Sequence, residues 1–69
     1  MKYRDLARRL KSLGCVPDRY AKGSHEIWMH SKTGARTTVP NWGSKDLKSG
    51  TVSRVLRDLG IRKEDFERG

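Results

Sequence analysis

The spacing of apolar residues changes twice along this chain, and these changes constrain its fold more than any other feature of the sequence. Apolar residues recur every three or four positions over residues 3–13 and again after Ser49, which is the period of an amphipathic helix. Between these segments, residues 16–22, 24–31 and 35–40 are expected to form short strands, with strand-preferring side chains concentrated in the second and third. The pattern predicts a helix, three strands and a helix.

Glycine and proline residues mark where these elements end. Gly14 and Gly60 follow the two amphipathic segments and can adopt the left-handed conformation that ends a helix. Ser49 is a predicted N-cap of the second helix. Gly34 supplies the positive φ of a hairpin loop. Pro40 is expected to close the third strand, because proline cannot donate a hydrogen bond to a central ladder.

These elements predict an α+β fold of the type α-β-β-β-α, in which residues 1–69 form a single domain. The two amphipathic helices would cover one face of a three-stranded antiparallel sheet and leave the other face open. This layout resembles the double-stranded-RNA-binding fold. A further helical turn over residues 63–67 would pack Phe66 back on the body.

The charge of the chain is strongly positive and unevenly distributed. Sixteen lysines and arginines stand against eight aspartates and glutamates, a net charge of +8. Residues 1–57 contain thirteen basic and four acidic residues, whereas residues 58–69 contain three and four. A basic body with a sequence pI near 10.3 is typical of a nucleic-acid-binding protein. An acidic protein partner is a second way to satisfy the same positive field.

Several other classes of protein are disfavoured. Cys15 is the only cysteine, so no internal disulfide can form, and a reducing, cytoplasmic location is expected. No apolar stretch is long enough to span a bilayer, and the basic N-terminus lacks the apolar run of a secretory signal. His25 and His30 lie five residues apart on one predicted strand, which points them to opposite faces. No metal site and no cofactor are therefore expected.

A single histidine in basic surroundings is sufficient for one class of reaction, the cleavage of RNA. The 2′-hydroxyl of RNA is an internal nucleophile, and an imidazole such as that of His25 can remove its proton as general base. Gly23 would allow close approach of an RNA backbone. The predicted RNA-binding residues are Lys22, Gly23, Ser24, Lys45 and Lys48, whose cations would stabilise the developing phosphate charge. The alternative for His25 is an ordinary strand histidine.

The two tryptophans carry different expectations. If Ile27 and Met29 face the helices, strand alternation places Trp28 on the open face, where it would stack on a base or anchor a partner. Packing against its own sheet is an equally good interpretation of Trp28. By the same alternation His25 shares the helix-facing side with Ile27, although its position at a strand end still allows contact with solvent. Trp42 lies in a predicted loop and is interpreted as a structural plug.

An ordered set of motifs along almost the whole chain resembles the HicA family. These motifs are residues 19–25 ending in Gly23-Ser24-His25, residues 33–36, Val39-Pro40, residues 45–51 and residues 55–61. The resemblance implies a toxin of a type II toxin–antitoxin system that has a double-stranded-RNA-binding-like fold and inhibits translation by cleaving mRNA. It also implies that His25 is the catalytic histidine and that a HicB-type antitoxin covers the site.

The chain departs from the HicA pattern at one place. Many members have a second histidine just after the Val-Pro pair, and here Asn41 and Trp42 occupy that position. Two alternatives accompany the ribonuclease hypothesis, one from the basic body and the predicted fold and one from Trp28. One is a non-catalytic module that binds duplex RNA, as typical members of the double-stranded-RNA-binding fold do. The other is a protein-binding subunit with Trp28 as its interface anchor.

Overall fold

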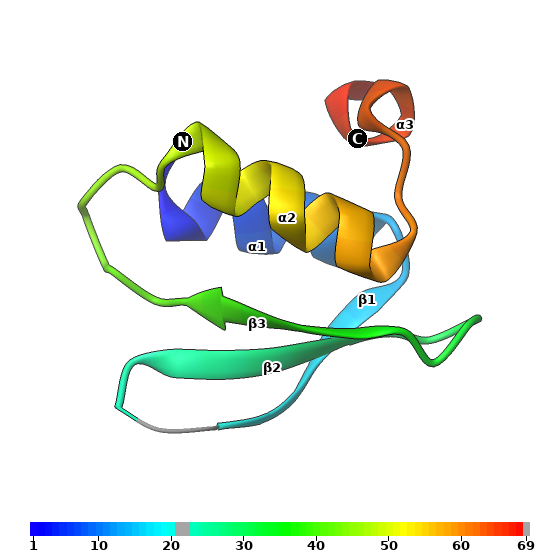
Figure 1. Cartoon of the computed structure of the whole chain (residues 1–69), viewed down its shortest axis with the longest axis horizontal. Coiled ribbons are helices and arrows are strands. Elements are labelled where there is room, and N and C mark those ends of the chain that lie inside the picture. The colour runs from blue at the N-terminus through cyan, green and yellow to red at the C-terminus, as the bar shows by residue number, and fades with distance from the viewer. Residues whose placement is uncertain (21–22, 69) are drawn as a thin grey trace.

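A computed structural model describes residues 1–20 and 23–68 of the chain. The elements in chain order are α1 (Tyr3–Ser12), β1 (Cys15–Tyr20), β2 (His25–His30), β3 (Arg36–Pro40), α2 (Ser49–Leu59) and α3 (Lys63–Arg68). This order confirms the predicted α+β fold, including the extra turn near the C-terminus. Figure 1 shows α1 and α2 on the same face of the sheet, with α3 lying across one end of the helix pair.

The sheet is antiparallel throughout, with the strand order β1-β2-β3. The pairing of β1 with β2 shifts between Pro17 and Arg19, so Asp18 is the extra residue of a β-bulge. The carboxylate of Asp18 lies 3.5 Å from Arg19 and 3.4 Å from Arg36 on the far strand. Pro17 is tolerated here because β1 is an edge strand. The resemblance to the double-stranded-RNA-binding fold stays a prediction.

The predicted helix ends are confirmed, but the predicted cap of α2 is wrong. Gly60 has a φ of +71°, and the amide of Ile61 donates to the Leu56 carbonyl at 2.9 Å, which is the bonding of a Schellman motif. At the other end of α2, Lys48 is the N-cap residue, with no side-chain capping bond, and Ser49 is already helical. The helix therefore begins one residue earlier than the serine pattern suggested.

The core lies between the sheet and the helices. It consists of Leu6, Leu10, Cys15, Trp28, Val39, Leu47, Val55, Leu56, Leu59 and Phe66. Phe66 packs on the body as predicted, and the guanidinium of Arg9 lies 5.2 Å from the centre of its ring. Burial raises the pKa of the Cys15 thiol, which fits the structural role expected for this residue. No helix among the described residues is long and apolar enough to cross a membrane.

The faces of β2 are the reverse of those predicted. Trp28 is 1% exposed and Glu26 is 6% exposed, so this pair faces the helices, whereas Ile27 and Met29 are only half-buried on the open face. The physical reason is that the larger apolar area of the indole is buried, and that Glu26 finds hydrogen-bond donors inside. An open-face position for Trp28, and with it an anchoring role in an interface, is therefore wrong. The same reversal places His25 on the open side.

Candidate functional site

The candidate catalytic edge is the end of the sheet at which β2 begins and β3 ends; it is not an edge strand. His25 is the first residue of β2 and pairs with Pro40, the last residue of β3. Just outside this pair, the amide of Asn41 donates to the carbonyl of Ser24 at 2.8 Å. The antiparallel register therefore holds the Gly23-Ser24-His25 segment beside the start of the loop that follows β3.

The residues of this segment are open to solvent. Gly23, Ser24 and His25 are all exposed. Gly23 has a φ of +62°, a conformation that favours glycine, and no described atom beyond its two chain neighbours lies within 4 Å of where a Cβ would stand. A polymer backbone can therefore approach the turn closely. Lys22, the cation predicted next to this glycine, lies outside the described residues.

The loop from Asn41 to Lys48 carries the other predicted cations. Lys45 and Lys48 are exposed, and Lys45 lines a shallow hollow together with Asn41 and Trp42. Lys48 lies further along the loop, at the N-terminus of α2. Lys45 thus shares a hollow with Asn41, whose amide is bonded to the Ser24 carbonyl. Lys48 is the N-cap residue of α2, and Figure 1 shows α2 in the helix layer.

Trp42 does not fill the interior of the protein. Its residue is 39% exposed, which makes it one of the few large apolar residues on the surface. The interpretation of Trp42 as a structural plug is therefore wrong. The backbone around it is turned tightly, because the amide of Lys45 donates to the Trp42 carbonyl at 3.2 Å and Gly43 has a φ of +62°.

Beneath this edge lies a buried polar cluster that the sequence did not reveal. Glu26 Oε1 accepts hydrogen bonds from the Tyr3 hydroxyl and from Trp28 Nε1, the latter at 3.1 Å. Glu26 Oε2 accepts from Asn41 Nδ2 at 3.4 Å. One carboxylate therefore links α1, β2 and the first residue of the loop. The signal in the sequence was the two-residue spacing of Glu26 and Trp28, which puts an acceptor and an N–H donor on one face of a strand.

The second histidine has a different setting from the first. His30 is half-buried at the far end of β2, and its Nδ1 accepts a hydrogen bond from the Lys32 amide at 3.2 Å in the hairpin loop. The alternation of the strand puts His30 on the side opposite to His25, as expected. Among the described residues, no three histidine, cysteine, aspartate or glutamate side chains are grouped so that they could hold a metal ion.

The open face of the sheet has an apolar strip beside the candidate edge. Val16 is 44% exposed and pairs with Met29, while Ile27 pairs with Arg19 on one side. Arg36 pairs with Met29 on the other side, so arginines flank the strip on both neighbouring strands. Such a strip with a charged border has the character of a protein interface more than that of a nucleic-acid groove.

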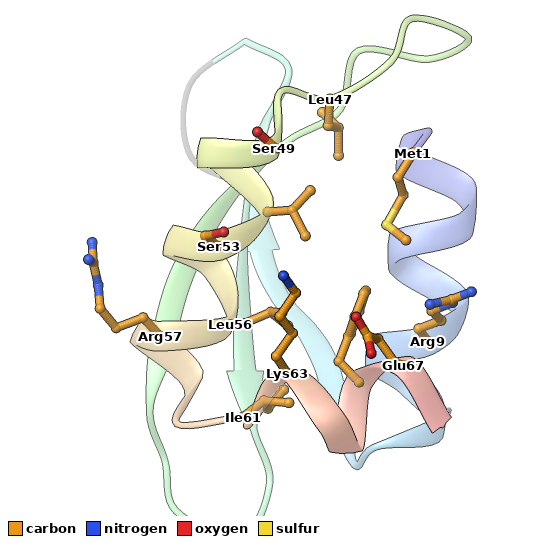
Figure 2. A pocket seen from close by; sticks show the side chains of 12 residues that line it. Met1, Arg9, Leu47, Ser49, Ser53, Leu56, Arg57, Ile61, Lys63 and Glu67 are labelled. Carbon is orange, nitrogen blue, oxygen red and sulfur yellow. The ribbon is translucent and has the colours of Figure 1, made fainter.

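A groove lies on the opposite layer, between the helices. It has a volume of about 530 Å³ and an apolar floor that includes Leu47, Leu56 and Phe66. Figure 2 shows Met1 and Arg9 on the α1 side and Ser53 and Leu56 on the α2 side, with Lys63 and Glu67 contributed by α3. No histidine lines this groove. The imidazole of His25 and this groove are therefore separate features.

The fold and this edge together define a small basic α+β protein with an exposed histidine and a lysine-bearing loop, arranged for an anionic polymer. A family model described as the HicA toxin of bacterial toxin–antitoxin systems matches residues 3–61, and the chain belongs to this family. A "Probable mRNA interferase HicA" of Pseudomonas fluorescens (strain Pf0-1) is 34% identical over 62 residues, which cover 90% of this chain and 98% of the relative. No solved structure gives a significant match. The predicted family is confirmed.

Proposed function

We propose that this chain is the toxin of a toxin–antitoxin pair and acts as an endoribonuclease on mRNA, with His25 as general base and without a metal ion. The family match and the printed name of the Pseudomonas relative support the activity. The observation that carries the assignment to His25 is its exposure at the start of β2, directly after the open turn at Gly23.

The reaction needs only the imidazole and the RNA itself. The imidazole of His25 takes the proton of the 2′-hydroxyl, and the 2′-oxygen forms a bond to the adjacent phosphorus. The bond from phosphorus to the 5′-oxygen breaks, and the leaving oxygen takes up a proton from solvent. The products are a 2′,3′-cyclic phosphate and a 5′-hydroxyl. No electron leaves or enters the system, so no redox cofactor takes part.

The lysines of the loop are placed to stabilise the negative charge that develops on the phosphate. Negative charge grows on the phosphate as the 2′-oxygen attacks, and fixed positive charge nearby stabilises it. Lys45 has this role because it lines the same hollow as Asn41, whose amide is bonded to the Ser24 carbonyl. Lys48 extends the positive surface to the N-terminus of α2, where free backbone amides also favour phosphate.

The antitoxin partner is proposed to bind across the open face of the sheet. The strip of Val16, Ile27 and Met29 gives it an apolar contact, and Arg19 and Arg36 favour an acidic border on the partner. A HicB-type protein seated there would also cover His25, which lies on the same side. This placement replaces the one based on Trp28, whose side chain is in the core.

The test is an RNA cleavage assay in the presence of EDTA. Wild-type protein is expected to cut a single-stranded RNA and leave 2′,3′-cyclic phosphate ends, and His25→Ala is expected to be inactive. The matched control is His30→Asn on the same strand, which retains an acceptor for the Lys32 amide and should cleave normally. Equal cleavage by wild type and His25→Ala would reject the role of His25. RNA binding without cleavage by any variant would instead support the non-catalytic module.

A further inference from the structure

We infer that Trp42 is a stacking platform for an unpaired base of the RNA, next to the phosphate that His25 acts on, and that the substrate is therefore single-stranded. The inference rests on the proposed function and adds a substrate class and a binding residue to it. The two tryptophans differ in exposure. Trp28 is 1% exposed and completes the core, whereas Trp42 is 39% exposed.

The position of Trp42 along the chain ties it to the catalytic edge. The residue before it, Asn41, donates its backbone amide to the Ser24 carbonyl at 2.8 Å. Ser24 in turn precedes His25. Trp42 therefore directly follows the residue whose backbone bond joins the loop to Ser24, so its ring is carried beside the candidate catalytic edge.

The loop is held firmly enough to present the ring. Asn41 Nδ2 donates to Glu26 Oε2 at 3.4 Å, and Asn41 Oδ1 accepts from the Gly43 amide at 3.2 Å. The Trp42 carbonyl accepts from the Lys45 amide at 3.2 Å. Hydrogen bonds thus bracket Trp42 on both sides, and one of them reaches a buried carboxylate. A ring on such a turn loses little further backbone freedom when it binds a ligand.

The charges around the loop fit a ligand with a base and a phosphate on each unit. Lys45 lines the same hollow as Trp42. Gly43 and Ser44, the next residues of the loop, line a second hollow with Lys2 and Arg4, both of which are exposed. An aromatic ring between cations is the arrangement that binds single-stranded nucleic acid, because bases stack on the ring while phosphates follow the positive groove.

The same geometry argues against duplex RNA as the ligand. Bases inside an A-form helix are stacked on each other and are not available to an external indole. A duplex would contact only the lysines and arginines, and the exposed ring would contribute little. Single-stranded RNA satisfies both the ring and the cations, so the observations favour it over the duplex that the double-stranded-RNA-binding resemblance would suggest.

The experiment uses the His25→Ala protein, which keeps the RNA intact, and follows tryptophan fluorescence. Trp28 also emits, but it is buried and cannot contact RNA, so an emission change that disappears in Trp42→Ala is assigned to Trp42. A short single-stranded RNA is expected to quench the emission, whereas the same sequence as a duplex, or a strand without bases, is not. Adding Trp42→Ala should weaken binding of the single strand about tenfold, and Trp42→Phe, which keeps an aromatic face, should bind within a few-fold of the parent.

The outcomes separate this inference from the ribonuclease proposal. Quenching and tenfold weaker binding support the stacking platform even if wild-type protein cleaves nothing, which would overturn only the proposed reaction. Equal RNA affinity of the His25→Ala protein with and without Trp42→Ala, in a folded protein, overturns the platform while leaving cleavage intact. Equal affinity for duplex and single strand also overturns it. Loss of antitoxin binding alone in Trp42→Ala would make Trp42 a protein contact and reject the inference.

Discussion

The substitution Glu26→Gln tests whether the buried carboxylate holds the candidate edge in place. Glu26 is 6% exposed and accepts hydrogen bonds from Tyr3, Trp28 and Asn41. A glutamine can keep its oxygen toward Tyr3 and Trp28, which share Oε1. Its NH₂ group then faces Asn41 Nδ2. Two hydrogen-bond donors therefore face each other where Glu26 Oε2 accepted from Asn41 Nδ2. Asn41 cannot correct this without cost, because its own oxygen is engaged by the Gly43 amide.

The magnitude follows from the strength of the bonds that change. A hydrogen bond to a charged acceptor contributes about 1.5–3 kcal/mol and a neutral one about 0.5–1.5 kcal/mol, so each of the two retained bonds loses about 1 kcal/mol. The contact with Asn41 is lost, and the lower desolvation cost of the neutral amide offsets part of the total. A net loss of about 2 kcal/mol is expected, against a total stability of roughly 3–10 kcal/mol for a domain of this size. The unfolding temperature should fall by about 8–16 °C.

The assay is urea and thermal unfolding at neutral pH. The matched control is Glu67→Gln, which neutralises an exposed glutamate on α3 and should change stability by less than about 0.5 kcal/mol. Asn41→Ala alone should cost less than Glu26→Gln, and the two effects should not add, because both remove the same contact. Equal stability of Glu26→Gln and Glu67→Gln, or full additivity with Asn41→Ala, would refute the assignment of this cluster.

Two further predictions concern the helices and the basic surface. Gly60→Ala should destabilise the protein by about 1–2 kcal/mol, because Gly60 has a φ of +71°. Gly50 lies within α2 and has open space where a Cβ would stand, so Gly50→Ala should stabilise the protein by about 0.5 kcal/mol. If chemical unfolding showed that both substitutions stabilise or both destabilise the protein, this prediction would be contradicted. For RNA, Lys45→Gln should reduce the slope of log affinity against log salt by about 0.7 for a single strand. Lys63→Gln, in the groove between the helices, should leave that slope unchanged, and identical slopes for both variants would remove Lys45 from the binding surface.

The elements of the fold were predictable because each depends on local physics. The helical period of residues 3–13 and the glycines at positions 14 and 60 fix where α1 and α2 end, whatever lies across from them. The hairpin at Gly34 and the strand end at Pro40 are equally local. The choice of His25 as the candidate catalytic residue depended on the family resemblance, and the exposure of His25 is compatible with this proposed role.

The faces of β2 were not predictable from that strand alone. Its alternation offers Ile27 and Met29 on one side or Glu26 and Trp28 on the other, and counting apolar residues favours the first pair. The choice is made by partners remote in the chain, since Tyr3 and Asn41 satisfy the carboxylate and allow the indole to be buried with it. A buried acceptor becomes favourable only when its donors are already in place, and their positions are a property of the whole fold.

This reversal has a consequence for how the candidate site is built. Had Ile27 faced the helices, His25 would have pointed toward the core side and the edge would have lacked an exposed imidazole. Because Glu26 turns inward instead, the residue before it turns outward, and the same carboxylate holds Asn41 at the start of the loop that carries Trp42 and Lys45. The core residue and the edge residues are therefore parts of one arrangement. After Val39-Pro40 the chain thus has an asparagine that binds the buried carboxylate and a tryptophan that faces solvent.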